Sequence, residues 1–150
     1  MSKNHENRYK TSRTTAGMTQ EAAAELLNVA PRTLSDYENG RVKVPDDVVA
    51  AMADIYKSPL LAWWHLKNYS VLGKYLPDVS MPQTTGDMAF QLILAQDDLA
   101  PNVTAIKHIV AGGEICEIKK QEFDKAVQGL REVQAKLISS IIYAGKFLDG

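Results

Sequence analysis

The sequence predicts an all-α protein: an N-terminal domain of five short helices, then a small helical C-terminal domain with one long helix. Two observations predict it. Apolar side chains recur at spacings of three and four residues in most of the chain, and no segment shows the period of two that strands require. Between residues 70 and 86, glycines and prolines interrupt the periodicity. We therefore expect domains at 1–69 and 87–150, joined by a linker at 70–86.

The N-terminal domain is divided by helix start and stop signals. The helices we expect there span about 4–16, 20–27, 31–38, 46–56 and 60–69. The hydroxyl of Thr19 is expected to cap the second helix, Asp46 the fourth, and Pro59 to open the fifth. Trp63 and Trp64 are adjacent and therefore about 100° apart on a helix, so we expect one of them to close the core.

The C-terminal domain is expected to hold three helices. The first runs from about 87 to 99, Pro101 opens a short second one that Gly112 and Gly113 end, and the third spans about 119–143. The third helix carries an apolar stripe that includes Phe123, Val127, Leu130, Leu137 and Ile141. Because the two shorter helices cannot cover this stripe completely, we expect its remainder, around Leu137 and Ile141, to meet a second copy in a symmetric homodimer. Packing within one subunit is the alternative.

Residues 20–39 have the pattern of two short helices joined by a tight turn. Ala24 stands where two crossing helices meet, and a larger side chain would separate them. Asn28 stands in the turn, where the backbone is left-handed and asparagine is tolerated next after glycine. The inward positions are Ala23, Leu27, Val29, Leu34 and Tyr37. An ordinary αα-hairpin shares this periodicity, but not the placement of the alanine and the asparagine.

On these residues the chain resembles the lambda-repressor-like, Cro-type (XRE) helix-turn-helix family over about residues 5–66. The matching segments are Gly17-Met18-Thr19-Gln20-Glu21, Ala24-Glu25-Leu26-Leu27-Asn28-Val29, Thr33-Leu34-Ser35-Asp36-Tyr37-Glu38-Asn39-Gly40 and the later Pro45. The resemblance implies a five-helix fold and a transcriptional regulator, by default a repressor, that binds operator DNA as a dimer. Ala30 departs from the family, which has a serine or threonine cap there, and so does Pro31, where relatives often contact a base.

The resemblance also implies which residues meet DNA. The side chains expected to face the bases are Pro31, Arg32, Ser35 and Asp36. Arg32 can bond the O6 and N7 atoms of guanine together, whereas Asp36 either accepts from cytosine N4 or pairs with Arg32. The side chains expected to reach phosphates are Gln20, Thr33, Asn39, Arg41 and Lys43. Family members also pair an arginine of the first helix with a glutamate of the third, here Arg13 and Glu38.

The charge distribution fits this expectation only weakly. The net charge is −1, with seven basic against five acidic side chains in residues 1–43 and seven against ten in residues 77–150. One copy should therefore bind double-stranded DNA weakly, and a dimer would double its phosphate contacts.

Other classes of function find little support in the sequence. His5, His65 and His108 lie in separate regions and no nucleophile has an evident base, so no enzyme, metal site or cofactor is expected. Cys116 is expected to be a structural thiol rather than a metal ligand. The sequence has no signal peptide and no apolar run of membrane-spanning length, so we expect a cytoplasmic protein.

The C-terminal domain leaves a second hypothesis open. Residues 109–115 resemble part of the C-terminal region of some phage-type regulators, which carry Asp-Gly where this chain has Gly112-Gly113. The alternative to a DNA-binding regulator is a protein-interaction module, or an antitoxin, whose helical tail binds a partner protein.

Overall fold

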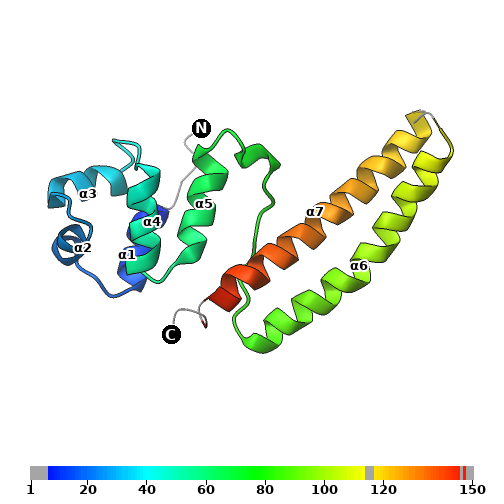
Figure 1. The fold of residues 1–150 in the computed structure, drawn as a ribbon. Coiled ribbons are helices and arrows are strands. Elements are labelled where there is room, and N and C mark those ends of the chain that lie inside the picture. Colours follow the sequence, from blue (N-terminus) through cyan, green and yellow to red (C-terminus); the bar gives the residue numbers. More distant parts are fainter. Residues whose placement is uncertain (1–6, 114–116, 146, 148–150) are drawn as a thin grey trace. The chain divides into compact units, whose positions relative to one another are not determined.

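The computed structural model describes residues 7–113, 117–145 and 147 (Figure 1). It divides into two compact units, Met1–Leu76 and Pro77–Gly150. All regular elements in the described ranges are helices, which confirms the all-α prediction. Residues 1–6 and 114–116, with His5 and Cys116 among them, lie outside the described part, so the expectations for them stay predictions.

The first unit contains the five helices that the sequence predicted. They are α1 (Arg8–Thr15), α2 (Gln20–Leu26), α3 (Pro31–Glu38), α4 (Asp46–Ile55) and α5 (Pro59–Tyr69). Asn7 caps α1 by accepting from the amide of Lys10, so this helix begins later than expected. A short 3-10 helix, η1 (Gly73–Tyr75), occupies part of the segment expected to be an irregular linker.

The core of the first unit is a single cluster to which α1 to α5 all contribute. Its buried members are Tyr9, Ala23, Ala24, Leu27, Leu34, Tyr37, Val44, Val49, Met52, Tyr56 and Leu61. Ala24 has no exposed surface, as its place between crossing helices requires. Trp64 packs against this cluster and meets the ring of Tyr9 edge to face, with 5.4 Å between centroids.

The second unit is a hairpin of two long helices, α6 (Thr85–Ala111) and α7 (Glu117–Gly145), which lie side by side (Figure 1). The predicted break near Pro101 is wrong, because α6 continues through it. A proline inside a helix removes one hydrogen bond and crowds the preceding turn. Pro101 is exposed, so this cost does not disturb the face packed on α7. The side chain of Asn102 also donates to the carbonyl of Asp98, 2.7 Å away.

Contacts between α6 and α7 run along both helices. Lys136 pairs with Asp98 at 2.7 Å, and the hydroxyl of Ser139 donates to the side-chain oxygen of Gln91 at 2.7 Å. Asn102 lies against Gly129, where a β-carbon would come within 2.4 Å of its amide. These contacts make the helices antiparallel and explain why α6 persists: packing outweighs the local preference to stop.

The continuous α6 corrects one premise of the predicted dimer. The helices α6 and α7 have 27 and 29 residues, so α7 has a partner of nearly its own length. A shortage of partner length therefore does not leave one end of α7 uncovered. The apolar stripe is nevertheless only partly covered by α6. Phe123, Val127 and Leu130 are half-buried, while Leu137 and Ile141 are 41% and 70% exposed.

Candidate nucleic-acid interface

The turn between α2 and α3 sets the angle at which α3 is presented. Asn28 has φ 53°, the left-handed backbone that the sequence predicted for this position. The amide of Asn28 donates to the carbonyl of Glu25, and the amide of Val29 to the carbonyl of Ala24, each at 3.0 Å. Pro31 opens α3 after Ala30, whose side chain makes no cap. The turn is therefore closed by the backbone alone.

The first turn of α3 presents its side chains to solvent. Pro31 and Arg32 are exposed, and Thr33, Ser35 and Asp36 are half-buried. Among the residues that the structure describes, Arg32 has no hydrogen-bond or ion-pair partner. Its guanidinium is therefore available to an external group that accepts hydrogen bonds.

Asp36 is engaged by a different arginine from the one considered in the sequence. Its carboxylate accepts from Arg41 at 3.0 Å, so pairing with Arg32 was the wrong intramolecular alternative. Gly40, with φ 66°, reverses the chain after α3 and brings Arg41 back beside Asp36. The amide of Arg41 also donates to the carbonyl of Asp36 at 2.9 Å. One carboxylate thus restrains an arginine expected at the DNA backbone.

Asn39, another residue expected to reach a phosphate, is bound back to its own helix. Its side-chain nitrogen donates to the carbonyl of Ser35 at 2.7 Å and contacts the Ser35 hydroxyl at 3.3 Å. Asn39 therefore stabilises the end of α3 when no DNA is present.

The other end of the interface is held by a buried ionic network. Arg13 Nε lies 2.5 Å from Glu38 Oε1 and Arg13 Nη2 lies 3.1 Å from Glu38 Oε2, so this arginine and this glutamate are paired. Gln20 donates to Glu38 Oε2 at 3.0 Å, and Arg13 Nη1 donates to the carbonyl of Met18 at 2.7 Å. The hydrogen bond that Arg13 donates to the Glu38 carboxylate raises the pKa of Arg13 above its ordinary value. The network ties α1 and the start of α2 to the end of α3.

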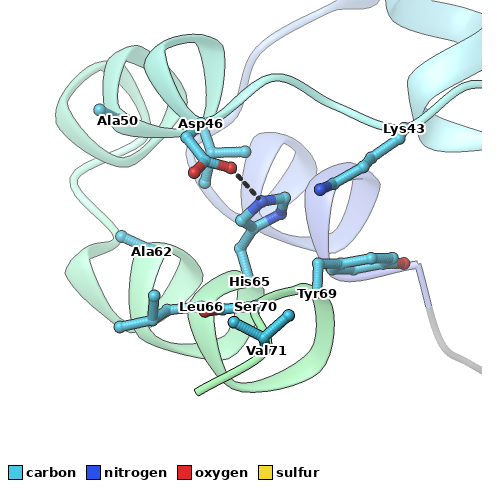
Figure 2. A pocket seen from close by; sticks show the side chains of 10 residues that line it. Lys43, Asp46, Ala50, Ala62, His65, Leu66, Tyr69, Ser70 and Val71 are labelled. Carbon is cyan, nitrogen blue, oxygen red and sulfur yellow. Dashed lines mark hydrogen bonds and ion pairs between the residues drawn. The ribbon is translucent and has the colours of Figure 1, made fainter. Parts of the chain in front are cut away.

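A second polar cluster, which the sequence did not indicate, lies next to Lys43 and consists of Tyr9, Asp46 and His65. His65 is buried; its Nδ1 lies 2.6 Å from the Tyr9 hydroxyl and its Nε2 lies 3.0 Å from Asp46 (Figure 2). An ionised carboxylate only accepts, so in the tautomer that satisfies both contacts Nε2 carries the hydrogen and Nδ1 is left to accept from Tyr9. Burial raises the pKa of Tyr9 well above its ordinary value, so Tyr9 remains a donor.

This cluster corrects the role expected for Asp46. Pro45 precedes α4 without a side-chain cap, Asp46 is the first residue of the helix, and its carboxylate accepts from His65. In the sequence, the burial of His65 was indicated only by its position four residues after Leu61, which places both side chains on the inward face of α5.

Beside His65 lies an open pocket of about 480 Å³ (Figure 2). Its walls come from α4, α5 and the residues after α5, and Lys43 extends over it toward His65 and Tyr69. Lys43 is exposed and, within the described ranges, has no ion-pair partner. The cluster therefore anchors α4 to α1 and α5 directly after the segment that carries Lys43.

Neither a metal site nor a membrane span emerges from the described residues. No group of three or more histidine, cysteine, aspartate or glutamate side chains there could hold a metal ion. None of the helices in that part combines the length and the apolar character needed to cross a bilayer.

Comparison with known proteins agrees with this geometry. Residues 9–61, roughly a third of the chain, match the family model of a helix-turn-helix domain. Comparisons with curated proteins and with solved structures give no significant match. The matched range covers α1 to α4 and the start of α5 and contains Asn28, Arg32 and the Arg13–Glu38 pair. Residues 9–61 are a helix-turn-helix domain, consistent with the lambda-repressor-like family that the sequence resembles and indicative of a DNA-binding regulator.

Proposed function

We propose that this protein is a sequence-specific transcriptional regulator, by default a repressor, in which α3 enters the major groove of operator DNA. The observation that carries the proposal is Arg32, which is exposed and has no partner among the described residues, at the start of a helix whose other end is fixed by Glu38. An arginine in this position can donate two hydrogen bonds to guanine. Ser35 and Pro31 flank it, the latter offering an apolar surface that suits a thymine methyl group.

The proposed phosphate contacts surround α3. Lys43 and Arg41 follow it, Thr33 and Asn39 lie on it, and Gln20 opens α2. The amides at the start of a helix and nearby cations both favour a phosphate. Arg41 and Asn39 must exchange their present partners for phosphate oxygens, whereas Gln20, whose side chain donates to Glu38, would contribute its backbone amide at the start of α2. Because the local excess of positive charge is small, we propose a dimer whose two α3 helices enter successive major grooves, roughly 34 Å apart.

Selection from a pool of random duplexes tests this function directly. The wild-type chain should enrich a site with two related half-sites, each containing a guanine whose replacement weakens binding. Arg32→Ala should lose preference at that base pair, at a cost of about 1–3 kcal/mol. Arg131→Ala, which removes an exposed arginine of α7, is the matched control and should select the wild-type site. If a folded wild-type chain enriches no sequence, the proposal is wrong.

The second candidate is a protein-interaction module or antitoxin in which DNA contact is secondary. The exposed apolar side chains of the second unit favour it. It predicts no enriched duplex and no effect of Arg32→Ala on any interaction of the tail.

A further inference from the structure

The second unit cannot bury enough apolar surface by itself. The buried apolar side chains in the described residues of α6 and α7 are Ala95, Ile109, Ala126, Val133 and Tyr143. Two of these five are alanines, whereas the cluster of the first unit has eleven members. At the same time the hairpin exposes Phe90, Leu92, Ile93, Leu99, Val110, Leu137 and Ile141. A two-helix hairpin with so small a core needs a further apolar surface to cover it.

The side chains of α7 form two stripes, each with a seven-residue (heptad) repeat. The stripe that faces α6 holds the buried Ala126, Val133 and Ser140, one every seven residues. A second, outer stripe consists of Phe123, Val127, Leu130, Gln134, Leu137 and Ile141. Its steps alternate between four and three residues, the spacing of helices that pack by knobs into holes. Gln134 is its one polar member.

The other helix repeats this pattern. The outer stripe of α6 consists of Leu92, Gln96, Leu99, Val103, Ile106 and Val110, again with alternating steps of four and three. Leu92, Leu99 and Val110 are 39%, 44% and 56% exposed. Gln96 is the one polar member of this stripe.

The two outer stripes lie on the same side of the hairpin. At 100° per residue, each is rotated by about 90° from the face that contacts the other helix. Because both helices are right-handed and run antiparallel, these rotations carry the two stripes to one side. The opposite side is mostly polar, apart from Phe90 and Ile93: it presents Asp97, Thr104 and His108 from α6 and Lys125, Gln128 and Glu132 from α7. We call the side that holds both outer stripes the apolar face.

The two glutamines of the apolar face lie at one level. Asn102 lies against Gly129, so Gln96, six residues before Asn102, is level with Gln134, five residues after Gly129. An amide side chain both donates and accepts, so it can pair with a copy of itself without any charged partner. A single polar layer in an apolar interface restricts the register and orientation of the helices.

We propose that a second copy of this chain covers the apolar face, giving a four-helix bundle whose two-fold axis runs along the bundle. That axis places all four glutamines in one layer. An axis across the middle of α6 would offset the two copies of Gln96 by about four residues, roughly 6 Å, and set each against Leu99 of the other copy, so the four glutamines would not share a layer. In the proposed bundle both copies of α6 begin at the same end, so both N-terminal units leave from that end. The inference rests on the proposed function only in the expectation of a dimer.

The mass of the full chain in solution, without DNA, tests the interface. Wild type should sediment as a dimer of about twice 16.6 kDa at tens of micromolar. Leu99→Glu combined with Leu137→Glu places a charge on each outer stripe and should give a monomer. Thr104→Glu combined with Gln128→Glu makes the same change on the opposite side and should stay dimeric. A monomeric wild type, or a dimer that survives Leu99→Glu with Leu137→Glu, would overturn the proposal.

Since the charged variant can lose the hairpin as well as the dimer, a second measurement uses wild type alone. The thermal midpoint of the hairpin, followed by helical circular dichroism, should rise with protein concentration because only the dimer is fully packed. A midpoint independent of concentration contradicts the proposal whatever the variants do.

The orientation is tested by one spin label on each copy, at Ala111→Cys in a Cys116→Ser background. Ala111 ends α6, so the axis along the bundle predicts labels within about 25 Å, given helix separations of 8–10 Å. The axis across the helices predicts about 40 Å, the length of 27 residues. The longer separation would refute the shared glutamine layer. None of these three experiments contains DNA, so failure of DNA selection is a distinct result.

Discussion

Glu38 is the acidic centre of the interface, and its removal gives the sharpest test of how α3 is held. Its carboxylate is 4% exposed and accepts from Arg13 at 2.5 and 3.1 Å and from Gln20 at 3.0 Å. Arg13 is 7% exposed, so Glu38→Ala leaves a buried guanidinium without its counter-charge.

The magnitude follows from this burial. Breaking a buried pair by removing one partner costs about 3–5 kcal/mol, against about 0–1 kcal/mol for an exposed pair. In a unit of this size each kcal/mol lowers the melting temperature by roughly 4–8 °C, so a loss of at least about 12 °C is expected. Glu25→Ala, an exposed glutamate of α2, should cost less than about 0.5 kcal/mol.

The assay is urea unfolding followed by tryptophan fluorescence, because both tryptophans lie in α5 and Trp64 packs on the core. Arg13→Met with Glu38→Leu should cost less than the two single changes together, by at least about 2 kcal/mol, since neither charge remains buried. If Glu38→Ala costs under about 1 kcal/mol, or if the cycle shows no coupling, the network does not hold α3.

Three further predictions concern single side chains, and the first two rest on the proposed DNA binding. Lys43→Ala should weaken binding to all duplexes alike and make the dependence on salt shallower by about one phosphate contact; a loss confined to one base pair would argue against a backbone contact. Asp36→Ala frees Arg41, so non-specific affinity should rise and the salt dependence steepen, whereas a changed base preference would make Asp36 a base contact. Burial raises the pKa of Tyr56 from 10.0 to about 12, so the folded state keeps a proton that the unfolded state loses, and stability should fall between those pH values. Tyr56→Phe should reduce this loss in urea titrations and leave neutral stability no lower, because the buried hydroxyl has no hydrogen-bond partner in the described structure; an unchanged alkaline loss would contradict the assignment.

Features set by neighbouring residues could be predicted from the sequence. The left-handed turn at Asn28, the start of α3 at Pro31 and the left-handed Gly40 depend on backbone sterics within a few residues. The inward positions from Ala23 to Tyr37 follow from helical periodicity, because each helix has one face that must be buried. The exposure of Arg32 is set by the same periodicity.

Side-chain pairings at the end of a helix were harder to predict from the sequence. Asp36 meets Arg41 rather than Arg32, although both are within five residues of it. The choice depends on how Gly40 turns the chain and on which rotamers the finished surface admits. Asn39 bends back to Ser35 for the same kind of reason.

Only the tertiary structure decided the remaining features. Tyr9 and His65 are 56 residues apart, and nothing local to either predicts their 2.6 Å contact. Pro101 predicted a helix end, yet α6 continues because its packing along α7 outweighs one lost hydrogen bond. The sequence by itself determined which faces of the helices are apolar, since that depends on spacing along one chain. Which of those faces meet within the subunit was decided by long-range packing, because burial is a property of pairs of surfaces that the spacing of one helix does not specify.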